Sequence, residues 1–500
     1  MRSALRVLNT LRYLKPVQVY TRYWRGRPQV KGMAPQRRPS SGAWQPPIAR
    51  PNLQIKQNHF CFLNQEHEIH SWNDSHIPKL WLYNLHYMDH PSTEFIERWI
   101  EGNPGAEGNG WEPYPLSLRI VNWVKWSLSG QAPSPQALRS LAEQARVLAQ
   151  SIEYHLQGNH LFVNFKALVF AGAFFSGAEA AGWLRTGLKG LAEQVREQIL
   201  TDGGHFERSP MYHALILEDL LDLINLSAVY PDVAAPWRDT AGRMLGWLES
   251  MCHPDGEISF FNDAAFGIAP QPRELSEYAA RLGIEPKCEQ LAESGYVRLE
   301  NPEAGVIFDA AAIGPDYQPG HAHADTLSFE LSVCGKRVLV NSGTSTYENS
   351  DERQQQRGTA AHNTIRIDGE DQSEMWSAFR VARRARPKDV QTDHRSFAQA
   401  AHTGYLRLKD PVLHTRRVEL RDDSLLISDL LEGRKAHRVE LFFHCHPEAY
   451  ITVEMDSQLV QSVEDTQWYP EFNRAVPNKT IVGRWFGQLP VRFETRIPFR

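Results

Sequence analysis

The strongest chemical signal in the sequence is the alternating group His321, His323 and Asp325. In an extended chain, residues two apart lie on one face, so we expect these three side chains to project together. Two imidazoles and a carboxylate can bind a metal, or they can divide into one ligand and one catalytic group. His362 opens a later predicted strand, with Asn341 on the strand between. These spacings fit either a structural metal site or a hydrogen-bonded histidine cluster.

Two further candidate groups stand at predicted helix starts. Asn159 and His160 precede an apolar helical run, where two neutral donors beside the positive end of a helix dipole are suited to binding a carboxylate. The alternative for Asn159 is a plain helix cap. Tyr212 follows a glycine-rich turn. Its phenol either points into a groove, or its ring packs in the interior while the hydroxyl stays in contact with water.

These candidates must be positioned by two different kinds of chain. From about residue 44 to 293, Ala/Leu-rich segments at helical spacing indicate helices stacked around an axis. From about residue 294, short alternating runs are typical of antiparallel sheets packed as a sandwich. We predict an α+β multidomain fold: a basic N-terminal arm over 1–45, an α/α toroid over 46–295 and an antiparallel β-sandwich over 296–500. A long ligand is expected in the cleft between the two domains.

Composition excludes several classes of protein. The 500 residues are 42% hydrophobic and 23% charged, which is typical of globular chains, and no apolar run approaches the roughly 20 residues of a membrane-spanning helix. Five scattered cysteines without a CxxC pair argue against a disulfide scaffold or a thiolate zinc site. With a net charge of −5 we expect no nucleic-acid partner, and we expect no organic cofactor.

The first 50 residues hold eleven Lys or Arg and no Asp or Glu. They begin with a predicted amphipathic helix and end in a Pro/Gly/Arg-rich stretch. Two interpretations stay open: a solvated arm or linker, and a segment that contacts an anionic membrane surface or partner. The apolar region around Val7–Leu14 is broken by Asn9, Thr10 and Arg12, so we recognise no secretory signal. We therefore expect a cytoplasmic location, with a periplasmic or cell-envelope location as the alternative.

Four motifs, in order, resemble the heparinase II/III-like polysaccharide lyases. They are NLHYMDH…GNGWEPYPLSLRIVNWVKW, GNHLFVNFKALVFAGAFF, GGHFERSPMYHALILEDL and GHAHADTLSFELSVCGKRVLVNSGTSTY…RGTAAHNTIRIDG. The resemblance runs from about Trp81 to Gly369. It implies an α/α toroid followed by an antiparallel β-sandwich, similar in architecture to some alginate lyases. It also implies β-elimination at a uronic acid of an anionic polysaccharide.

The resemblance implies a role for each catalytic candidate. Asn159, assisted by His160, would hydrogen-bond the uronate carboxylate and so favour an enolate-like intermediate. Tyr212 and His321 match the acid/base positions of the family. Tyr212 would protonate the leaving oxygen, or would serve as both base and acid.

A tyrosine acting as a base would need help from its neighbours. The free side chain has a pKa of about 10, which nearby cationic or donor groups would have to lower. His205, Arg208 and His213 are candidates by their nearness in sequence. Aromatic faces stack on sugar rings, although the Trp-Glu-Pro-Tyr-Pro segment also reads as a rigid structural loop. The predicted substrate contacts are His86, Trp111, Glu112, Tyr114 and His205.

By the same resemblance, His323 and His362 would be ligands of a structural zinc ion. The sequence departs from the family pattern at Asn341, where an acidic ligand is expected. An amide is a poorer zinc ligand than a carboxylate. The predicted zinc site is therefore weak, takes another metal or is absent.

Two other functions stay open. A glycoside hydrolase on the same toroid would use two carboxylates, with Asp202, Glu207 and Asp263 as the supply. A non-catalytic glycan-binding factor in exopolysaccharide assembly would keep the cleft without turnover. The candidates for a locally positive groove are Arg353, Arg357, Arg380, Arg383 and Arg384.

Overall fold

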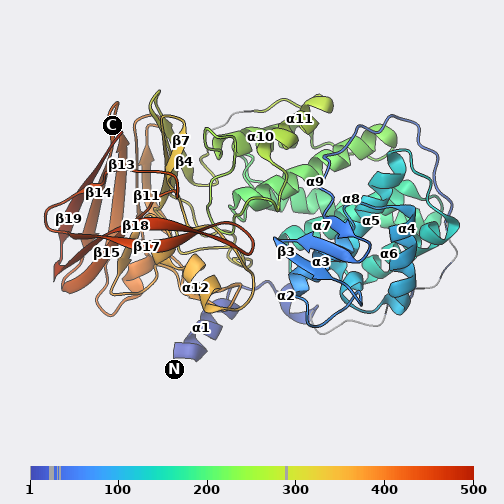
Figure 1. The fold of residues 1–500 in the computed structure, drawn as a ribbon, viewed down its shortest axis with the longest axis horizontal. Coiled ribbons are helices and arrows are strands. Elements are labelled where there is room, and N and C mark those ends of the chain that lie inside the picture. The colour runs from blue at the N-terminus through green and yellow to red at the C-terminus, as the bar shows by residue number, and fades with distance from the viewer. Residues whose placement is uncertain (1, 22–27, 31, 33–34, 288–290, 500) are drawn as a thin grey trace.

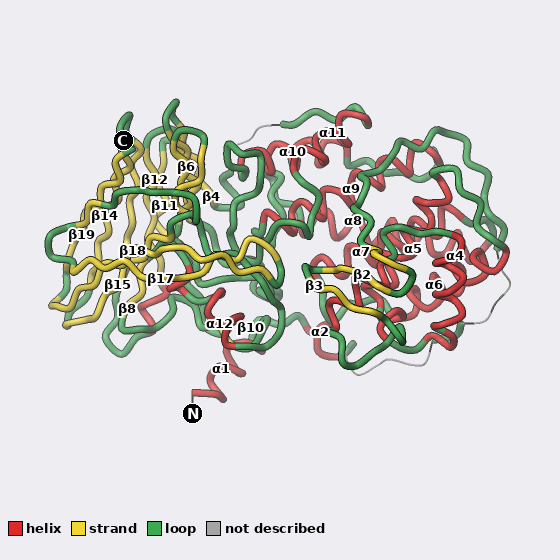
Figure 2. The backbone as a smooth tube through the Cα atoms, viewed as in Figure 1, coloured by secondary structure: helices red, strands yellow, loops and turns green. Residues whose placement is uncertain are grey.

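The computed structural model describes residues 2–21, 28–30, 32, 35–287 and 291–499. A helical body from the first half of the chain lies beside a β body from the second half (Figures 1 and 2). This order of a helical domain followed by antiparallel sheets fits the predicted toroid and sandwich, and it confirms the predicted fold class.

Two buried helices form the centre of the helical domain. Helix α7 buries every residue except His160, and α9 is buried over most of its length. Both are apolar on all sides, as expected for helices surrounded by other helices. The domain contains α3 (Lys79–Tyr87), α4 (Thr93–Gly102), α5 (Pro113–Leu128), α6 (Pro135–Gln150), α7 (Gly158–Phe174), α8 (Ala178–Gln198), α9 (Pro210–Val229), α10 (Arg238–Ser250) and α11 (Pro272–Arg281).

The chain before α3 departs from the helical character predicted from about residue 44. A small antiparallel sheet contains β1 (Gln54–Lys56), β2 (His59–Phe62) and β3 (Gln65–Glu68). Phe60 of β2 packs in one apolar cluster with Trp81 and Leu85 of α3. The sheet therefore extends the helical domain, and its short strands give too little periodicity to be recognised in the sequence.

The β domain packs three antiparallel sheets around one apolar core, as predicted. The first sheet contains β4 (Tyr296–Glu300), β5 (Ala304–Asp309), β6 (Phe329–Val333) and β7 (Lys336–Leu339). The second contains β17 (Val460–Glu471), β18 (Arg474–Gln488), β15 (Ala436–His444) and β8 (Ile365–Ile367) in that order. The third contains β11 (Pro387–Thr392), β12 (Phe397–His402), β13 (Leu413–Leu420), β14 (Ser424–Glu432), β19 (Val491–Pro498) and β16 (Glu454–Met455). Helix α12 (Asp351–Arg357) and the short strands β9 (Met375–Trp376) and β10 (Arg380–Val381) lie in the connections.

The long hairpin β17–β18 reaches from the β domain to the helical domain (Figure 1). Near its tip, the side chain of Asn473 donates to the Leu63 carbonyl at 2.8 Å. Asn64 donates back to the Glu471 carboxylate at 2.9 Å. The turn between β2 and β3 and the tip of this hairpin therefore meet, although they lie more than 400 positions apart in the sequence.

The N-terminal arm is packed against both domains over much of its length. It begins with α1 (Arg2–Leu11) and α2 (Pro16–Tyr20). Lys15 pairs with Glu197 of α8, and Gln18 donates to the Tyr317 carbonyl at 3.1 Å. The solvated-linker interpretation is therefore wrong for this part of the arm. None of the helices in the described ranges is long and apolar enough to cross a membrane.

Candidate active site in the interdomain cleft

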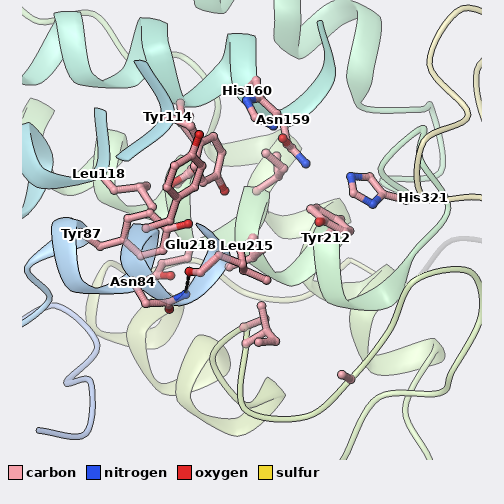
Figure 3. A pocket seen from close by; sticks show the side chains of 18 of the residues that line it. Asn84, Tyr87, Tyr114, Leu118, Asn159, His160, Tyr212, Leu215, Glu218 and His321 are labelled. Atoms are coloured by element: carbon pink, nitrogen blue, oxygen red, sulfur yellow. Dashed lines mark hydrogen bonds between the residues drawn. The ribbon is translucent and has the colours of Figure 1, made fainter. Parts of the chain in front are cut away.

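A cleft of about 1490 Å³ opens between the helical and β domains. Its lining includes the N-termini of α7 and α9, the loop before β6 and the end of hairpin β17–β18. All four predicted catalytic residues line it: Asn159, His160, Tyr212 and His321 (Figure 3). The structure thus brings together side chains that come from two domains.

An unusual turn delivers Asn159 to the cleft. Gln157 and Gly158 both have left-handed φ angles, of 65° and 56°, just before α7. A Cβ atom on Gly158 would lie 2.4 Å from an oxygen of Glu207, so a larger residue at this positive φ would be strained and would displace that carboxylate. Asn159 follows in the first turn of α7, and its side-chain oxygen has no hydrogen-bond partner. Because Gln157 occupies the cap position, the structure does not support Asn159 as a plain cap.

His160 is oriented by a buried carboxylate. Its Nδ1 lies 3.1 Å from Glu153. Burial acts to raise the pKa of Glu153, but His160 and Asn164 outweigh it and lower that pKa. An ionised carboxylate only accepts, so Nδ1–H of His160 donates to it. The ring of Tyr114, which also lines the cleft, lies against His160 with 4.5 Å between centroids.

The start of α9 fixes Tyr212. The Ser209 hydroxyl caps the helix by accepting from the Tyr212 NH at 3.2 Å. The phenol ring stacks on the His321 imidazole with 3.8 Å between centroids, and its hydroxyl lies 2.9 Å from that of Tyr347. Burial, together with Tyr347 and Asp263, holds the pKa of Tyr212 well above 10. The phenol is therefore a protonated donor at neutral pH.

A buried aspartate sets the tautomer of His321. Asp263 accepts from His321 Nδ1 at 2.9 Å through one oxygen and contacts His323 Nε2 at 2.9 Å through the other. Arg353 binds both oxygens of the same carboxylate. Burial acts to raise the pKa of Asp263, but Arg353, His321 and His323 outweigh it and hold that pKa well below the usual value. Because Nδ1–H of His321 donates to this anion, Nε2 is the ring nitrogen that remains for a ligand.

Sequence reasoning missed Tyr347 and the role of Arg353, and it considered Glu207 only for hydrolysis. Glu207 Oε2 lies 3.8 Å from His321 Nε2. Burial raises the pKa of Glu207, and the His321 imidazole and the Asn159 backbone NH only partly offset it. Tyr347 and Glu207 lie in motif segments that the resemblance covers, but no spacing within those segments distinguishes them.

Three predicted substrate contacts lie in the core instead of the cleft. His86 and His205 are fully buried; His86 bonds to protein groups through both ring nitrogens, and His205 bonds to Gln198 through Nε2. Trp111 packs against Trp99 and donates to a backbone carbonyl, as in the rigid-loop interpretation. These three predictions are wrong because aromatic residues of a helical core resemble sugar platforms in sequence.

Glu112 is the fourth predicted contact that does not line the cleft. It accepts from the Tyr83 hydroxyl and pairs with Lys79 at 2.9 Å, and both of these partners do line the cleft. Its observed role is to hold α3. Of the five predicted substrate contacts, Tyr114 is the one in the cleft lining.

The neighbours expected to lower the Tyr212 pKa point elsewhere. His213 Nε2 bonds to the Met244 carbonyl at 2.8 Å, and Arg208 Nε donates to the Ser294 carbonyl at 2.9 Å. That hypothesis is wrong, in agreement with the upward shift of the Tyr212 pKa.

The predicted shared face of the HxHxD motif is also wrong. Residues 321–325 form an irregular loop that precedes β6. His321 and His323 converge on Asp263, whereas Asp325 turns away and accepts from the Asn262 backbone NH at 3.1 Å.

The predicted metal ligands bond to protein groups. Asn341 accepts from His362 Nδ1 at 3.1 Å, and His323 is bonded to Asp263. Burial lowers the pKa of His323 to about 4 and the pKa of His362 well below 6.5, so both imidazoles are neutral. Among the residues that the structure describes, no three His, Cys, Asp or Glu side chains are grouped to hold a metal ion. Each imidazole bonds through one ring nitrogen, whereas His323 Nδ1 and His362 Nε2 are buried and have no hydrogen-bond partner among the described residues. The group is therefore not a fully satisfied hydrogen-bonded cluster, and zinc stays a prediction.

The three carboxylates predicted for a hydrolase are not in the cleft lining. Asp202 is buried and accepts from the Ser294 hydroxyl at 2.7 Å. Asp263 is bound by Arg353, and Glu207 lies 3.8 Å from His321 Nε2. Of the five candidate arginines, Arg380 and Arg384 line the cleft, whereas Arg353, Arg357 and Arg383 do not.

Two family models match the chain. The model described as "Heparinase II/III N-terminus" matches residues 124–280, and that described as "Heparinase II/III-like, C-terminal" matches residues 284–491. A heparin-sulfate lyase of Bacteroides stercoris is 25% identical over 259 residues, which cover 46% of this chain and 38% of that protein. The FtsZ-localized protein C of Caulobacter vibrioides is 24% identical over 401 residues, 72% of this chain and 66% of that protein.

Solved structures show the same fold. A crystal structure of heparinase III superposes with a TM-score of 0.68 at 17% identity, covering 86% of this chain and 79% of that one. The chain spans half or less of the length of the heparin-sulfate lyases it matches, between 38% and 50%.

Proposed function

The chain belongs to the heparinase II/III-like family, and from this membership we propose that it is a polysaccharide lyase that cleaves a uronic-acid-containing polysaccharide by β-elimination. The observation that carries the proposal is the stack of Tyr212 on His321 in the cleft, with the Asp263 anion behind the imidazole. A phenol and an imidazole thus lie side by side in the cleft.

The first requirement of the reaction is to neutralise the uronate carboxylate, because the C5 proton beside a carboxylate anion is only weakly acidic. Asn159 supplies a side-chain NH₂ donor in the first turn of α7, where the helix dipole favours negative charge. His160 lies next to it at the cleft surface. Together they would stabilise the negative charge that develops when C5 loses its proton.

The second requirement is a base and an acid. We assign the base to His321 Nε2, which takes the C5 proton. The electron pair of that C–H bond forms the C4–C5 double bond, the C4–O4 bond breaks, and O4 takes a proton from the Tyr212 hydroxyl. The raised pKa of Tyr212 supports the acid role over a double role as base and acid. Tyr347, 2.9 Å from that hydroxyl, can return a proton to Tyr212.

A panel of uronate polymers tests the reaction class. Alginate, glycosaminoglycans and bacterial exopolysaccharides are incubated with the protein while ultraviolet absorbance and reducing ends are recorded. A conjugated C4–C5 double bond gives new absorbance together with new reducing ends. New reducing ends without that absorbance would instead identify a hydrolase and overturn the proposal.

The variant Tyr212→Phe tests the assignment of the acid. It keeps the ring that stacks on His321 and removes the donated proton, so kcat is expected to fall by about 10²–10⁴ while polymer affinity is kept. Tyr450→Phe is the matched control, because Tyr450 is fully exposed. An unchanged kcat in Tyr212→Phe would refute the assignment.

The non-catalytic alternative has its own outcome. The similarity to FtsZ-localized protein C extends over 72% of this chain, and the name of that protein does not describe an enzyme. If the wild type binds one of the polymers and cleaves none of them, the lyase proposal is wrong and the glycan-binding function takes its place.

A further inference from the structure

Helix α1 is attached to the β domain by its polar face. The Thr10 hydroxyl accepts from the Trp376 indole NH at 3.2 Å. It also lies 3.3 Å from the Val381 carbonyl, with the Arg6 carbonyl of its own helix at 2.9 Å. Arg6, on the same side of the helix, lies 3.8 Å from the Glu374 carboxylate. Thr10 is consequently 7% exposed although the helix stands at the edge of the molecule (Figure 1).

The apolar face of α1 points to solvent. Leu5, Leu8 and Leu11 are 49%, 62% and 54% exposed, and they recur at a spacing of three, which puts them on one side of the helix. A surface helix of a globular protein normally buries this face against the core. Helix α1 is turned the other way, so its apolar stripe faces solvent and is available to a partner outside the described chain.

The charge around this stripe favours an anionic surface. Residues 1–21 carry four Lys or Arg and no Asp or Glu. Arg12 directly follows the helix and is exposed, whereas Arg6 and Lys15 face Glu374 and Glu197. A second copy of the chain would bring two basic segments together, whereas anionic lipid headgroups complement them. A helix with an apolar face and basic flanks is suited to lying in the interface of a bilayer.

We propose that α1 binds the surface of an anionic lipid bilayer, with Leu5, Leu8 and Leu11 inserted at the boundary of headgroups and acyl chains. The binding would also orient the cleft. Thr10, Leu14 and Gln18 belong to the cleft lining, so the bound segment is continuous with one wall of the site. This proposal stands independently of the lyase reaction.

Vesicle flotation with the full chain tests the proposal. We expect the wild type to float with vesicles of phosphatidylcholine and phosphatidylglycerol, less with pure phosphatidylcholine, and less again as salt is added. Leu8→Glu should weaken binding to the mixed vesicles at least tenfold, because it removes an inserted leucine and adds a negative charge. Leu8 points to solvent, so the melting temperature should not change.

Val463→Glu is the matched control. Val463 is 61% exposed on β17, in the β domain, and it too is an exposed apolar residue replaced by glutamate. It should bind the mixed vesicles as the wild type does. Equal binding of Leu8→Glu and wild type, or no binding of the wild type, would overturn the proposal. So would a wild-type dimer in light scattering that Leu8→Glu dissociates, because the stripe would then be an interface between copies.

Discussion

His321 and His323 bond to the same carboxylate, Asp263, but their surroundings differ. His321 bonds to one oxygen of Asp263 and borders the cleft, where Tyr212 stacks on it. His323 bonds to the other oxygen, is fully buried and lies 5.2 Å from the ring of His362. Both histidines come from the same loop, two positions apart.

The comparison teaches that access, and not the residue type, separates a reactive imidazole from a structural one. Asp263 fixes the ring of His321 and leaves Nε2 on the side of the cleft, so that nitrogen can accept a proton from a ligand. The same carboxylate engages Nε2 of His323, whose other nitrogen faces the protein interior. We therefore expect substitutions of His321 to affect catalysis and substitutions of His323 to affect stability.

The largest expected effect is on turnover, in His321→Asn. The asparagine amide lies near the position of Nδ1 and can still donate to Asp263, but it cannot act as a base, so kcat should fall by about 10²–10⁴. The melting temperature should change little because the ring borders the cleft. Steady-state kinetics on the cleaved polymer and calorimetry measure the two quantities.

His323→Leu is the matched variant for this experiment. Leucine cannot donate, so a buried hydrogen bond to the ionised Asp263 is lost and the free energy of unfolding should fall by about 1.5–3 kcal/mol. Its kcat should fall less than tenfold. Equal losses of kcat in both variants would remove the distinction between His321 and His323.

Asp263→Asn should affect His321 and His323 at once. The amide leaves the buried Arg353 guanidinium without its counter-ion, which should cost about 3–5 kcal/mol of stability. The His321 tautomer is also no longer fixed by an anion, so kcat should fall. Urea unfolding gives the stability. Asp465→Asn breaks the exposed pair with Lys479 and should change stability by less than about 1 kcal/mol.

The sequence predicts the parts of this site that rest on local pattern. The spacing of apolar residues indicated the two central helices, and their first turns carry Asn159 and Tyr212. Alternation indicated the antiparallel sheets. The ordered motifs place His321 with Asn159 and Tyr212 among the catalytic candidates, and all three side chains line one cleft.

The remaining features depend on contacts between distant segments, which a single sequence does not encode visibly. Arg353 is important because it reaches Asp263, 90 positions away. Tyr347 is important because its hydroxyl meets that of Tyr212. His86 lies inside the core, and its residue type alone does not predict this burial.

Asn341→Asp tests whether the buried group is one side chain short of a metal site. A carboxylate beside the two neutral imidazoles would complete a set of three ligands. We expect added zinc to leave the melting temperature of the wild type unchanged and to raise that of the variant. At a zinc concentration of 100 times Kd the gain would be about 2.7 kcal/mol. Zinc bound stoichiometrically by the purified wild type, measured by elemental analysis, would contradict this expectation.

The remaining expected effect is the pH dependence of stability that the buried histidines cause. Burial lowers the pKa of His323 to about 4, whereas the unfolded chain binds the proton near pH 6.5. The stabilisation is therefore fully present above pH 6.5 and is lost as the pH falls toward 4. The loss is about 1.4 kcal/mol per pH unit for each such histidine.

Replacing one of these imidazoles should reduce that slope. His444 provides a second case, because burial also lowers its pKa to about 4. The free energy of unfolding of His323→Gln and of His444→Gln is measured between pH 7 and 4. In each variant it should fall less steeply with falling pH than in the wild type. The difference in slope should correspond to the binding of about one proton. An unchanged slope in His323→Gln would mean that this imidazole is protonated in the folded protein. The His323 ring would then be charged beside Asp263, and the contrast with His321 would have to be drawn from access to the cleft alone.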